Sequence, residues 1–300
     1  MAIKKSQKKW IKFLSRFHFN MKKNYKIYRK AVEVVNGHPL QRFRQRKEVI
    51  KIKDYEVPIF LFTPKKETKK VILFFHGGGF ISGSIYSYHS FCSLLAEKLE
   101  QAVISVDYRL APEFPFPVGL SDCYEATEKL YSILKERGVL EEDITLMGDS
   151  AGGNLAAVVS LMARDKKSFT VKRQVLIYPL VDTDLDSYPS IKENGTDYLL
   201  TEKQIEDYLH LYLTKKEDYK NPYVAPILAD LSCQPDTFIL VATYDPLKDQ
   251  GKAFAKHLQE AGNKAVLFEV EELHGFMLRK KSKANTFIAL DQIKQFINGK

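Results

Sequence analysis

A serine stands between two glycines at residues 148–152, in the stretch Gly-Asp-Ser-Ala-Gly. This spacing fits the pattern Gly-x-Ser-x-Gly, in which a sharp turn from a strand to a helix exposes the serine hydroxyl at the edge of a sheet. Residues 144–147 predict a short buried strand before Ser150, and residues 150–162 predict a helix after it. The pattern therefore indicates a nucleophile, provided that the chain also supplies a base and donors for a developing anion.

A serine hydroxyl becomes a nucleophile when a base takes its proton, and that base needs an orienting carboxylate. Asp245 and His274 each follow a predicted late strand, so both should lie at the same sheet edge as Ser150. The order serine, aspartate, histidine is the order found in α/β-hydrolases. Asp249 is close enough in sequence to replace Asp245, since an Asp-Pro pair after a strand is also a common turn start. We interpret Ser150, Asp245 and His274 as a catalytic triad.

The remaining histidines are weaker candidates for the base. Five of them fall in predicted helices, in loops or near the amino terminus, and none of these follows a late strand: His18, His38, His89, His210 and His257. His76 does follow a strand, but it opens a separate motif.

Three consecutive glycines follow His76, directly after the predicted strand 71–75. Glycine loses more conformational freedom on folding than any other residue, so such a run indicates a backbone with a special shape. We expect the amides of Gly77 and Gly78, together with the amide of Ala151, to point at one substrate oxygen as an oxyanion hole. The alternative is a flexible glycine loop. His76 is expected to brace this loop by hydrogen bonding.

The elements that must position these residues alternate along the chain. Two strands at 49–52 and 57–62 form a predicted hairpin through Asp54 and Tyr55. After them come predicted strands at 71–75, 102–106, 144–147, 174–178, 237–241 and 265–270, and predicted helices at 90–99, 121–137, 150–162 and 251–261. Such alternation is typical of an α/β fold with a mostly parallel sheet and helices on both faces.

The interval 182–233 breaks this alternation. It contains a predicted helical stretch at 202–213 and no clear strand. An insertion of this length in a compact domain is usually a lid or a binding loop.

The amino-terminal segment is strongly basic. Residues 1–32 contain eleven Lys and Arg and no acidic residue, so residues 33–300 sum to −2 although the whole chain carries +9. An apolar stripe at helical spacing runs through these charges: Trp10, Leu14, Phe17 and Met21. An amphipathic helix of this kind needs an apolar partner, which is either another part of the protein or a membrane surface.

Composition restricts the protein class. The chain has 300 residues and 45% hydrophobic content, which is enough for a large buried core. Its apolar runs are far shorter than the roughly 18–20 residues that span a bilayer. The widely spaced Cys92, Cys123 and Cys233 fit neither a disulfide framework nor a metal site, and the basic start lacks the features of a secretory signal. These features lead us to expect a cytoplasmic protein. We expect no nucleic-acid partner, because residues 33–300 are near neutral in charge and carry no recognised nucleic-acid-binding motif.

Five ordered motifs resemble those of the hormone-sensitive lipase-like branch of α/β-hydrolase esterases. They are His-Gly-Gly-Gly-Phe at 76–80, Asp-Tyr-Arg-Leu-Ala-Pro-Glu-Phe-Pro-Phe-Pro at 107–117, Gly-Asp-Ser-Ala-Gly-Gly-Asn at 148–154, Asp-Pro-Leu at 245–247 and His-Gly-Phe at 274–276. The resemblance implies a serine carboxylesterase of the α/β-hydrolase fold with a helical cap and without metal or other cofactor. Where the family often has Arg-Asp-Glu-Gly after the acid, this chain has Lys-Asp-Gln-Gly at 248–251.

The resemblance also divides the chain. Residues 46–300 are expected to form the catalytic domain, and the cap is expected to combine residues 1–45 with part of 182–233. Arg109 and Glu113 are expected to fix the chain beside the site, and Asp149 to support the turn at the nucleophile.

The leading functional prediction is hydrolysis of a small ester with a short, acetyl-type acyl group through an acyl-enzyme intermediate. An amidase or deacetylase for aryl amides or N-formyl groups would use the same triad. A non-catalytic receptor for small molecules on the same scaffold is the alternative from another class, because a fold does not fix a function. The sequence predicts no particular oligomeric state, and peripheral membrane contact remains the alternative role of the basic segment.

Overall fold

The structure is a computed structural model that describes residues 21–36, 45–196 and 198–299 of the chain. Trp10, Leu14 and Phe17 of the predicted apolar stripe lie outside the described residues, whereas Met21 lies inside them.

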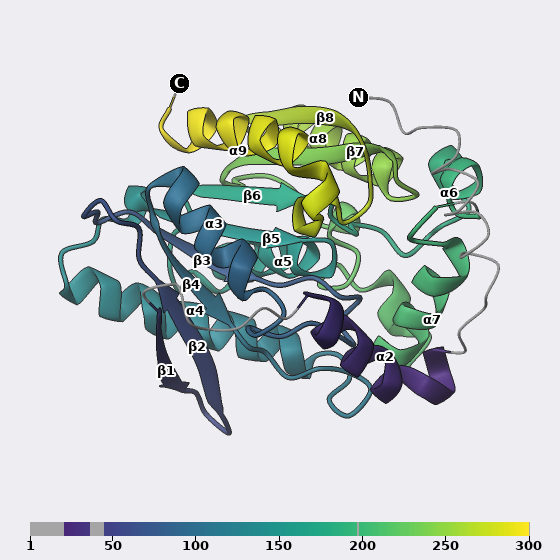
Figure 1. Cartoon of the computed structure of the whole chain (residues 1–300), viewed down its shortest axis with the longest axis horizontal. Coiled ribbons are helices and arrows are strands. Elements are labelled where there is room, and N and C mark those ends of the chain that lie inside the picture. The colour runs from purple at the N-terminus through teal and green to yellow at the C-terminus, as the bar shows by residue number, and fades with distance from the viewer. Residues whose placement is uncertain (1–20, 37–44, 197, 300) are drawn as a thin grey trace.

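One eight-stranded sheet crosses the molecule in the order β1-β2-β4-β3-β5-β6-β7-β8 (Figure 1). The strands are β1 (Gln45–Lys51), β2 (Glu56–Phe62), β3 (Val71–Phe75), β4 (Ala102–Val106), β5 (Ile144–Asp149), β6 (Arg173–Ile177), β7 (Asp236–Tyr244) and β8 (Ala265–Leu273). β2 pairs antiparallel with β1 and β4, and the other neighbours are parallel. The predicted hairpin and the mostly parallel sheet are both confirmed.

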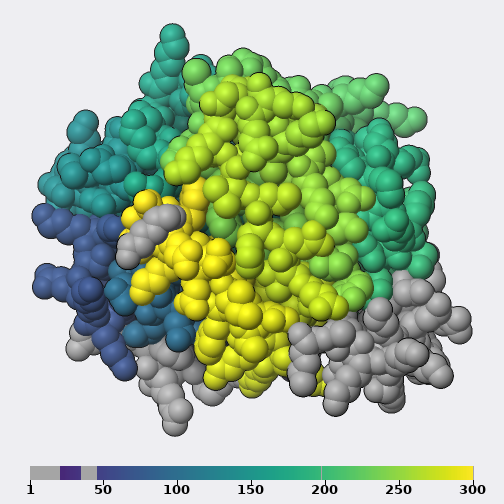
Figure 2. Space-filling view, turned by 90° about the horizontal axis from the view of Figure 1, so that it is seen from above, coloured from purple at the N-terminus to yellow at the C-terminus, as the bar shows by residue number. Residues whose placement is uncertain are grey.

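Helices cover both faces of the sheet. One face carries α4 (Val118–Glu136), α5 (Ala151–Lys166) and α8 (Lys248–Glu260), and the other carries α3 (His89–Leu99) and α9 (Lys283–Ile297). Because both faces are covered, a central strand such as β3 is buried at every position, as its unbroken apolar run indicates. Seen from above, the chain from about residue 240 onward forms one continuous surface, drawn in yellow-green and yellow (Figure 2).

Helix α9 was not among the elements predicted from the sequence. Its buried residues recur at helical spacing and pack against the core beside α3: Thr286, Ala289, Leu290, Ile293, Phe296 and Ile297. The signal was therefore present in the sequence.

Three helices lie beyond the carboxyl ends of the parallel strands, at the right-hand end of Figure 1. They are α2 (Met21–Asn36), α6 (Pro189–Asn194) and α7 (Glu202–Tyr212). The predicted helical stretch is α7, which begins at a capping box between Thr201 and Gln204. The described part of 182–233 contains no strand, as expected.

Single turns of 3-10 helix complete the chain at η1 (Glu141–Asp143), η2 (Glu217–Lys220), η3 (Pro226–Leu228), η4 (Phe276–Leu278) and η5 (Lys280–Ser282). Within the described ranges, no helix has the length and apolar character needed to cross a membrane.

Candidate active site

Ser150 occupies the sharp turn between β5 and α5. Its φ of 55° and ψ of −120° lie in a region that residues other than glycine rarely adopt. The flanking glycines are required by close approach: a Cβ at Gly148 would lie 2.1 Å from the carbonyl oxygen of Gly152, and a Cβ at Gly152 would lie 2.1 Å from the carbonyl oxygen of Phe75. The Ser150 amide donates to the carbonyl oxygen of Ile177 at 2.8 Å and so helps to hold the turn.

The structure brings Ser150, Asp245 and His274 together. Ser150 Oγ lies 2.9 Å from His274 Nε2, and His274 Nδ1 lies 2.7 Å from Asp245 Oδ2. Asp245 is fully buried, and its Oδ1 accepts the amide of Leu247 at 2.8 Å, which fixes the carboxylate. With Nδ1–H donated to Asp245, Nε2 is the nitrogen that accepts the serine hydroxyl.

Asp249, the alternative acid, does not contact the histidine. It lies in the first turn of α8, and its Oδ2 accepts the amide of Ser190 at 2.8 Å. Of the two acids that the sequence left open, Asp245 is the one beside His274.

The prediction that the Gly77 amide belongs to the oxyanion hole is wrong. The amide of Gly77 donates to Asp149 Oδ1 at 2.8 Å and lies 3.1 Å from the hydroxyl of Tyr88, so it is not available to a substrate oxygen. The physical reason is the burial of Asp149, whose carboxylate needs donors and also accepts the Tyr88 hydroxyl at 2.9 Å. Gly78 and Gly79 have φ values of 117° and 62°, and their amides donate to no acceptor among the described residues.

Asp149 directly precedes Ser150, and those two bonds hold its carboxylate against the glycine loop and Tyr88. Burial raises the pKa of Asp149 to about 6, although the Tyr88 hydroxyl and the Gly77 amide act in the opposite direction. An aspartate in an unfolded chain has a pKa of about 3.9. At a pH between these two pKa values, the folded protein therefore binds more protons than the unfolded chain. Its free energy of unfolding falls as the pH rises through this range.

Asp149→Asn should remove the part of the pH dependence of stability that comes from the titration of Asp149. Relative to the variant, the wild-type free energy of unfolding should decline by about 3 kcal/mol between about pH 4 and pH 7, because each pKa unit corresponds to about 1.4 kcal/mol. Urea unfolding of both proteins across this range measures the difference. A difference that stays constant with pH would contradict the assignment.

His76 lies at the start of the glycine loop and is fully buried. Its Nδ1 donates to the carbonyl oxygen of Gly77 at 2.9 Å, and its ring stacks on Tyr108 with centroids 4.4 Å apart. The Tyr108 hydroxyl in turn donates to the His76 carbonyl oxygen at 2.7 Å. Burial lowers the pKa of His76, which favours the neutral ring. These contacts suit the bracing role expected of it.

The segment 107–117 is tied to its surroundings by two arginines. The guanidinium of Arg109 donates two bonds to the buried Asp122, at 2.9 and 2.6 Å, and the Arg109 amide donates a third at 3.0 Å. Glu113 accepts two bonds from Arg29 of α2, at 2.9 and 2.7 Å, and Arg29 also donates to the carbonyl oxygen of Ala111 at 2.6 Å. Glu113 therefore connects this segment to α2, and its partner Arg29 was not predicted from the sequence.

Ser150 and His274 open onto a cavity of about 190 Å³. The hydroxyls of Tyr28 on α2 and Tyr208 on α7 lie 2.9 Å apart, and both residues line this cavity. Further lining residues are Val32, Gly77, Gly78, Gly79, Ser82, Gly83, Tyr88, Asp149, Leu199, Leu200, Gln204, Gly275 and Leu278. The residues from α2 and α7 were not identified from the sequence, because no local pattern brings two segments this far apart together.

In the part of the chain that the structure describes, no group of three or more His, Cys, Asp or Glu side chains is arranged to hold a metal ion.

Comparison with known proteins identifies a matching family and several related sequences. A sequence model of the alpha/beta hydrolase fold matches residues 72–278. An arylesterase from Saccharolobus solfataricus is 38% identical over 256 residues, covering 84% of this chain and 82% of that protein. An ethyl acetate hydrolase from Pseudomonas putida is 33% identical over 214 residues, which cover 69% of this chain and 67% of that protein.

A solved structure agrees over the whole chain. The hyperthermophilic esterase from Pyrobaculum calidifontis superposes with a TM-score of 0.86 at 31% identity, covering 100% of this chain and 99% of that one. The sheet order, the turn at Ser150 and these similarities lead to one assignment. The chain belongs to the α/β-hydrolase fold family, in the hormone-sensitive lipase-like branch of carboxylesterases.

Proposed function

We propose that this protein is a serine carboxylesterase that hydrolyses small esters with short acyl groups. The observation that carries the proposal is the continuous line of contacts from Ser150 Oγ through the imidazole of His274 to the buried carboxylate of Asp245. This is the arrangement that activates a serine hydroxyl. The strained backbone at Ser150, which costs of order 1–3 kcal/mol, favours an enzyme over a receptor, because binding alone requires no strained serine.

The proposed reaction has two steps. Ser150 Oγ attacks the ester carbonyl carbon while His274 Nε2 takes the hydroxyl proton; the bond to the alcohol oxygen then breaks, and His274 returns the proton to the leaving alcohol. A water molecule, deprotonated by the same nitrogen, then attacks the acyl-serine; the bond between the acyl carbon and Ser150 Oγ breaks, His274 returns the proton to Oγ, and the carboxylic acid is released. In both steps the Asp245 carboxylate stabilises the imidazolium that forms.

Both steps place a negative charge on the former carbonyl oxygen. We assign its stabilisation to the amides of Gly78, Gly79 and Ala151. The first two line the cavity beside Ser150, and Ala151 is the first residue of α5, where the amides have no partner within the helix and the helix dipole is positive. Gly77 is excluded because its amide is bound to Asp149.

We further propose that residues 1–45 and part of 182–233 form a cap that limits acyl length. Tyr208 packs so closely on the glycine loop that a Cβ at Gly79 would lie 2.5 Å from its ring. Small-molecule pockets usually measure about 300–1,000 Å³, so a cavity of about 190 Å³ suits a short acyl group. The name of the Pseudomonas putida relative, an ethyl acetate hydrolase, supports the acetyl-type assignment.

A panel of p-nitrophenyl esters from acetate to palmitate tests this function. We expect kcat/KM to be highest for acetate or butyrate and at least roughly tenfold lower for palmitate, because a long chain must displace the contact between Tyr28 and Tyr208. Tyr208→Ala should raise turnover of the longer esters relative to acetate. Tyr223→Ala is the matched control, since Tyr223 lies in the same insertion but its hydroxyl contacts Asp165, away from the cavity. Preference for palmitate, or no hydrolysis of any ester, would contradict the proposal.

A further inference from the structure

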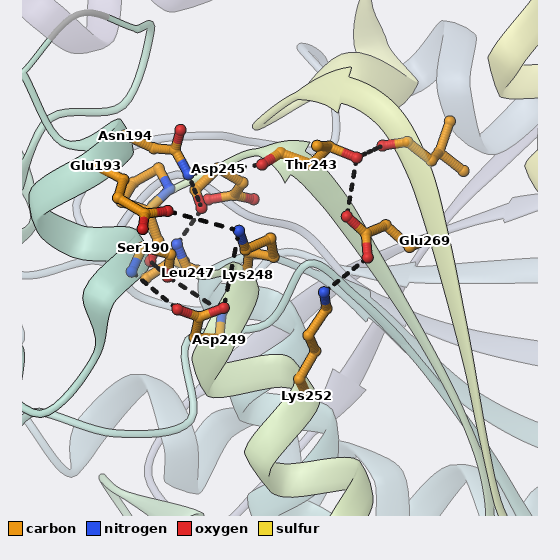
Figure 3. A network of polar contacts seen from close by, with 12 residues as sticks. Ser190, Glu193, Asn194, Thr243, Asp245, Leu247, Lys248, Asp249, Lys252 and Glu269 are labelled. Atoms are coloured by element: carbon orange, nitrogen blue, oxygen red, sulfur yellow. Dashed lines mark hydrogen bonds and ion pairs between the residues drawn. The ribbon is translucent and has the colours of Figure 1, made fainter.

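Helix α6 lies directly against the loop that carries Asp245, between β7 and α8 (Figure 3). Ser190 makes three hydrogen bonds to this loop and the helix start after it. Its hydroxyl donates to the carbonyl oxygen of Pro246 at 2.7 Å and accepts the amide of Asp249 at 3.1 Å. Its own amide donates to the Asp249 carboxylate at 2.8 Å. One residue of the insertion thus holds the chain on the carboxyl side of Asp245.

Asn194 holds the other side of the same loop. Its Nδ2 lies 3.3 Å from the carbonyl oxygen of Asp245 and 3.5 Å from that of Thr243, so one amide group bridges both (Figure 3). From the opposite direction, the Thr243 hydroxyl donates to Glu269 Oε1 at 2.9 Å, and Glu269 pairs with Lys252 at 2.7 Å. The backbone around Asp245 is therefore held from α6 and from β8.

The two residues of α6 that contact the Asp245 loop are buried. The exposed fraction is 0% for Ser190 and 6% for Asn194. A buried polar group that loses its partner bears the full desolvation cost, so these bonds define one position of the loop. By contrast, the ion pair between Lys248 and the exposed Glu193 spans 3.9 Å and contributes little to that position.

The position of this loop matters for chemistry. The carboxylate of Asp245 must orient His274 so that Nε2 faces Ser150, and a displacement of about 1 Å in such a group can cost about a hundredfold in rate. The bonds that Ser190 and Asn194 make to the backbone around Asp245 can therefore affect the reacting atoms through its carboxylate.

We propose that Ser190 and Asn194 are positioning residues through which the segment 182–233 sets the place of Asp245 relative to His274. This inference rests on the proposed role of Asp245 in ester hydrolysis. It gives the insertion a second task beside forming the wall of the cavity, since α6 contacts the acid loop whereas α7 contacts the substrate side.

The first measurement compares two serines of the same insertion. Ser190→Ala removes two of the three contacts, and we expect kcat on p-nitrophenyl acetate to fall roughly tenfold while KM stays within about twofold. Ser187→Ala is the matched control, because Ser187 is exposed and its hydroxyl donates to Asp184, on the surface of the same segment. Equal kcat values for wild type and Ser190→Ala, or a change confined to KM, would overturn the inference.

The second measurement asks whether Ser190 acts through Asp245. In an Asp245→Asn background, Ser190→Ala should change kcat by less than about twofold, because the group that it positions is already altered. A further full tenfold loss in that background would show an independent, general effect and would overturn the inference.

Urea unfolding of each variant separates positioning from loss of fold. If Ser190→Ala does not fold, Asn194→Ala enters the same cycle with the same expected results. A failure of the proposed function looks different: either wild-type protein hydrolyses no ester, or Asp245→Asn alone leaves kcat unchanged, and both inferences then fall together.

Discussion

Replacement of Ser150 by alanine is expected to lower ester turnover by roughly ten-thousandfold or more. In the proposed mechanism the variant loses the oxygen that forms the acyl-enzyme, and the residual rate comes from the oxyanion donors and from binding alone. The fold should persist, because the Ser150 amide still donates to the carbonyl oxygen of Ile177 and the hydroxyl has no described partner other than His274. Steady-state kinetics and circular dichroism measure both parts.

Two controls sharpen this first prediction. His274→Ala should lower turnover about as much as Ser150→Ala, because members of a triad act as a unit and their effects do not add. Each sample must be verified by mass, since a trace of wild-type enzyme would conceal a large loss. A Ser150→Ala protein that retains about a tenth of wild-type activity would rule out Ser150 as the nucleophile.

The second large effect is expected for Asp245→Asn, with a loss in kcat of roughly a thousandfold to ten-thousandfold. Asparagine has nearly the same shape, but it cannot stabilise an imidazolium, and its amide nitrogen disfavours the tautomer in which Nδ1 carries the proton. The loss should appear in kcat, with KM for a small ester nearly unchanged.

The chain supplies a matched control in Asp249→Asn, four residues away. The asparagine oxygen can still accept the amide of Ser190, and Asp249 does not contact His274, so activity should stay within about threefold of wild type. Equal losses for the two variants, or a larger loss for Asp249→Asn, would contradict the assignment of the acid.

Much of the architecture could be predicted because it depends on local sequence patterns. The run at 71–75 is apolar at every position, and strand β3 occupies those residues. The glycines around Ser150 follow from close backbone approach, which the pentapeptide already indicates. Helix α9 was missed although its buried positions show the helical period.

The details of the site depend on contacts between distant segments, which no local pattern contains. Gly77 was assigned to the wrong partner because the direction of its amide is set by Asp149, 72 residues further along the chain. The bond from Arg29 to Glu113 spans 84 residues, and the contact between Tyr28 and Tyr208 spans 180. Such pairs need the folded chain before they can be identified.

Met21 bears on the role of the basic segment. Its side chain is 1% exposed and belongs to the hydrophobic core, which supports the cap hypothesis over a membrane anchor for this position. The other three residues of the predicted stripe lie outside the described residues.

The most direct test of the account is to identify the atom that carries the acyl group during turnover. Hydrolysis of p-nitrophenyl acetate, stopped by acid within the first turnover and followed by peptide mass mapping, should place an acetyl group on the peptide that contains Ser150. The same treatment of Ser150→Ala should yield no acetylated peptide. An acetyl group on another side chain at comparable occupancy, or turnover without labelling at Ser150 under conditions that trap other serine esterases, would contradict the central claim.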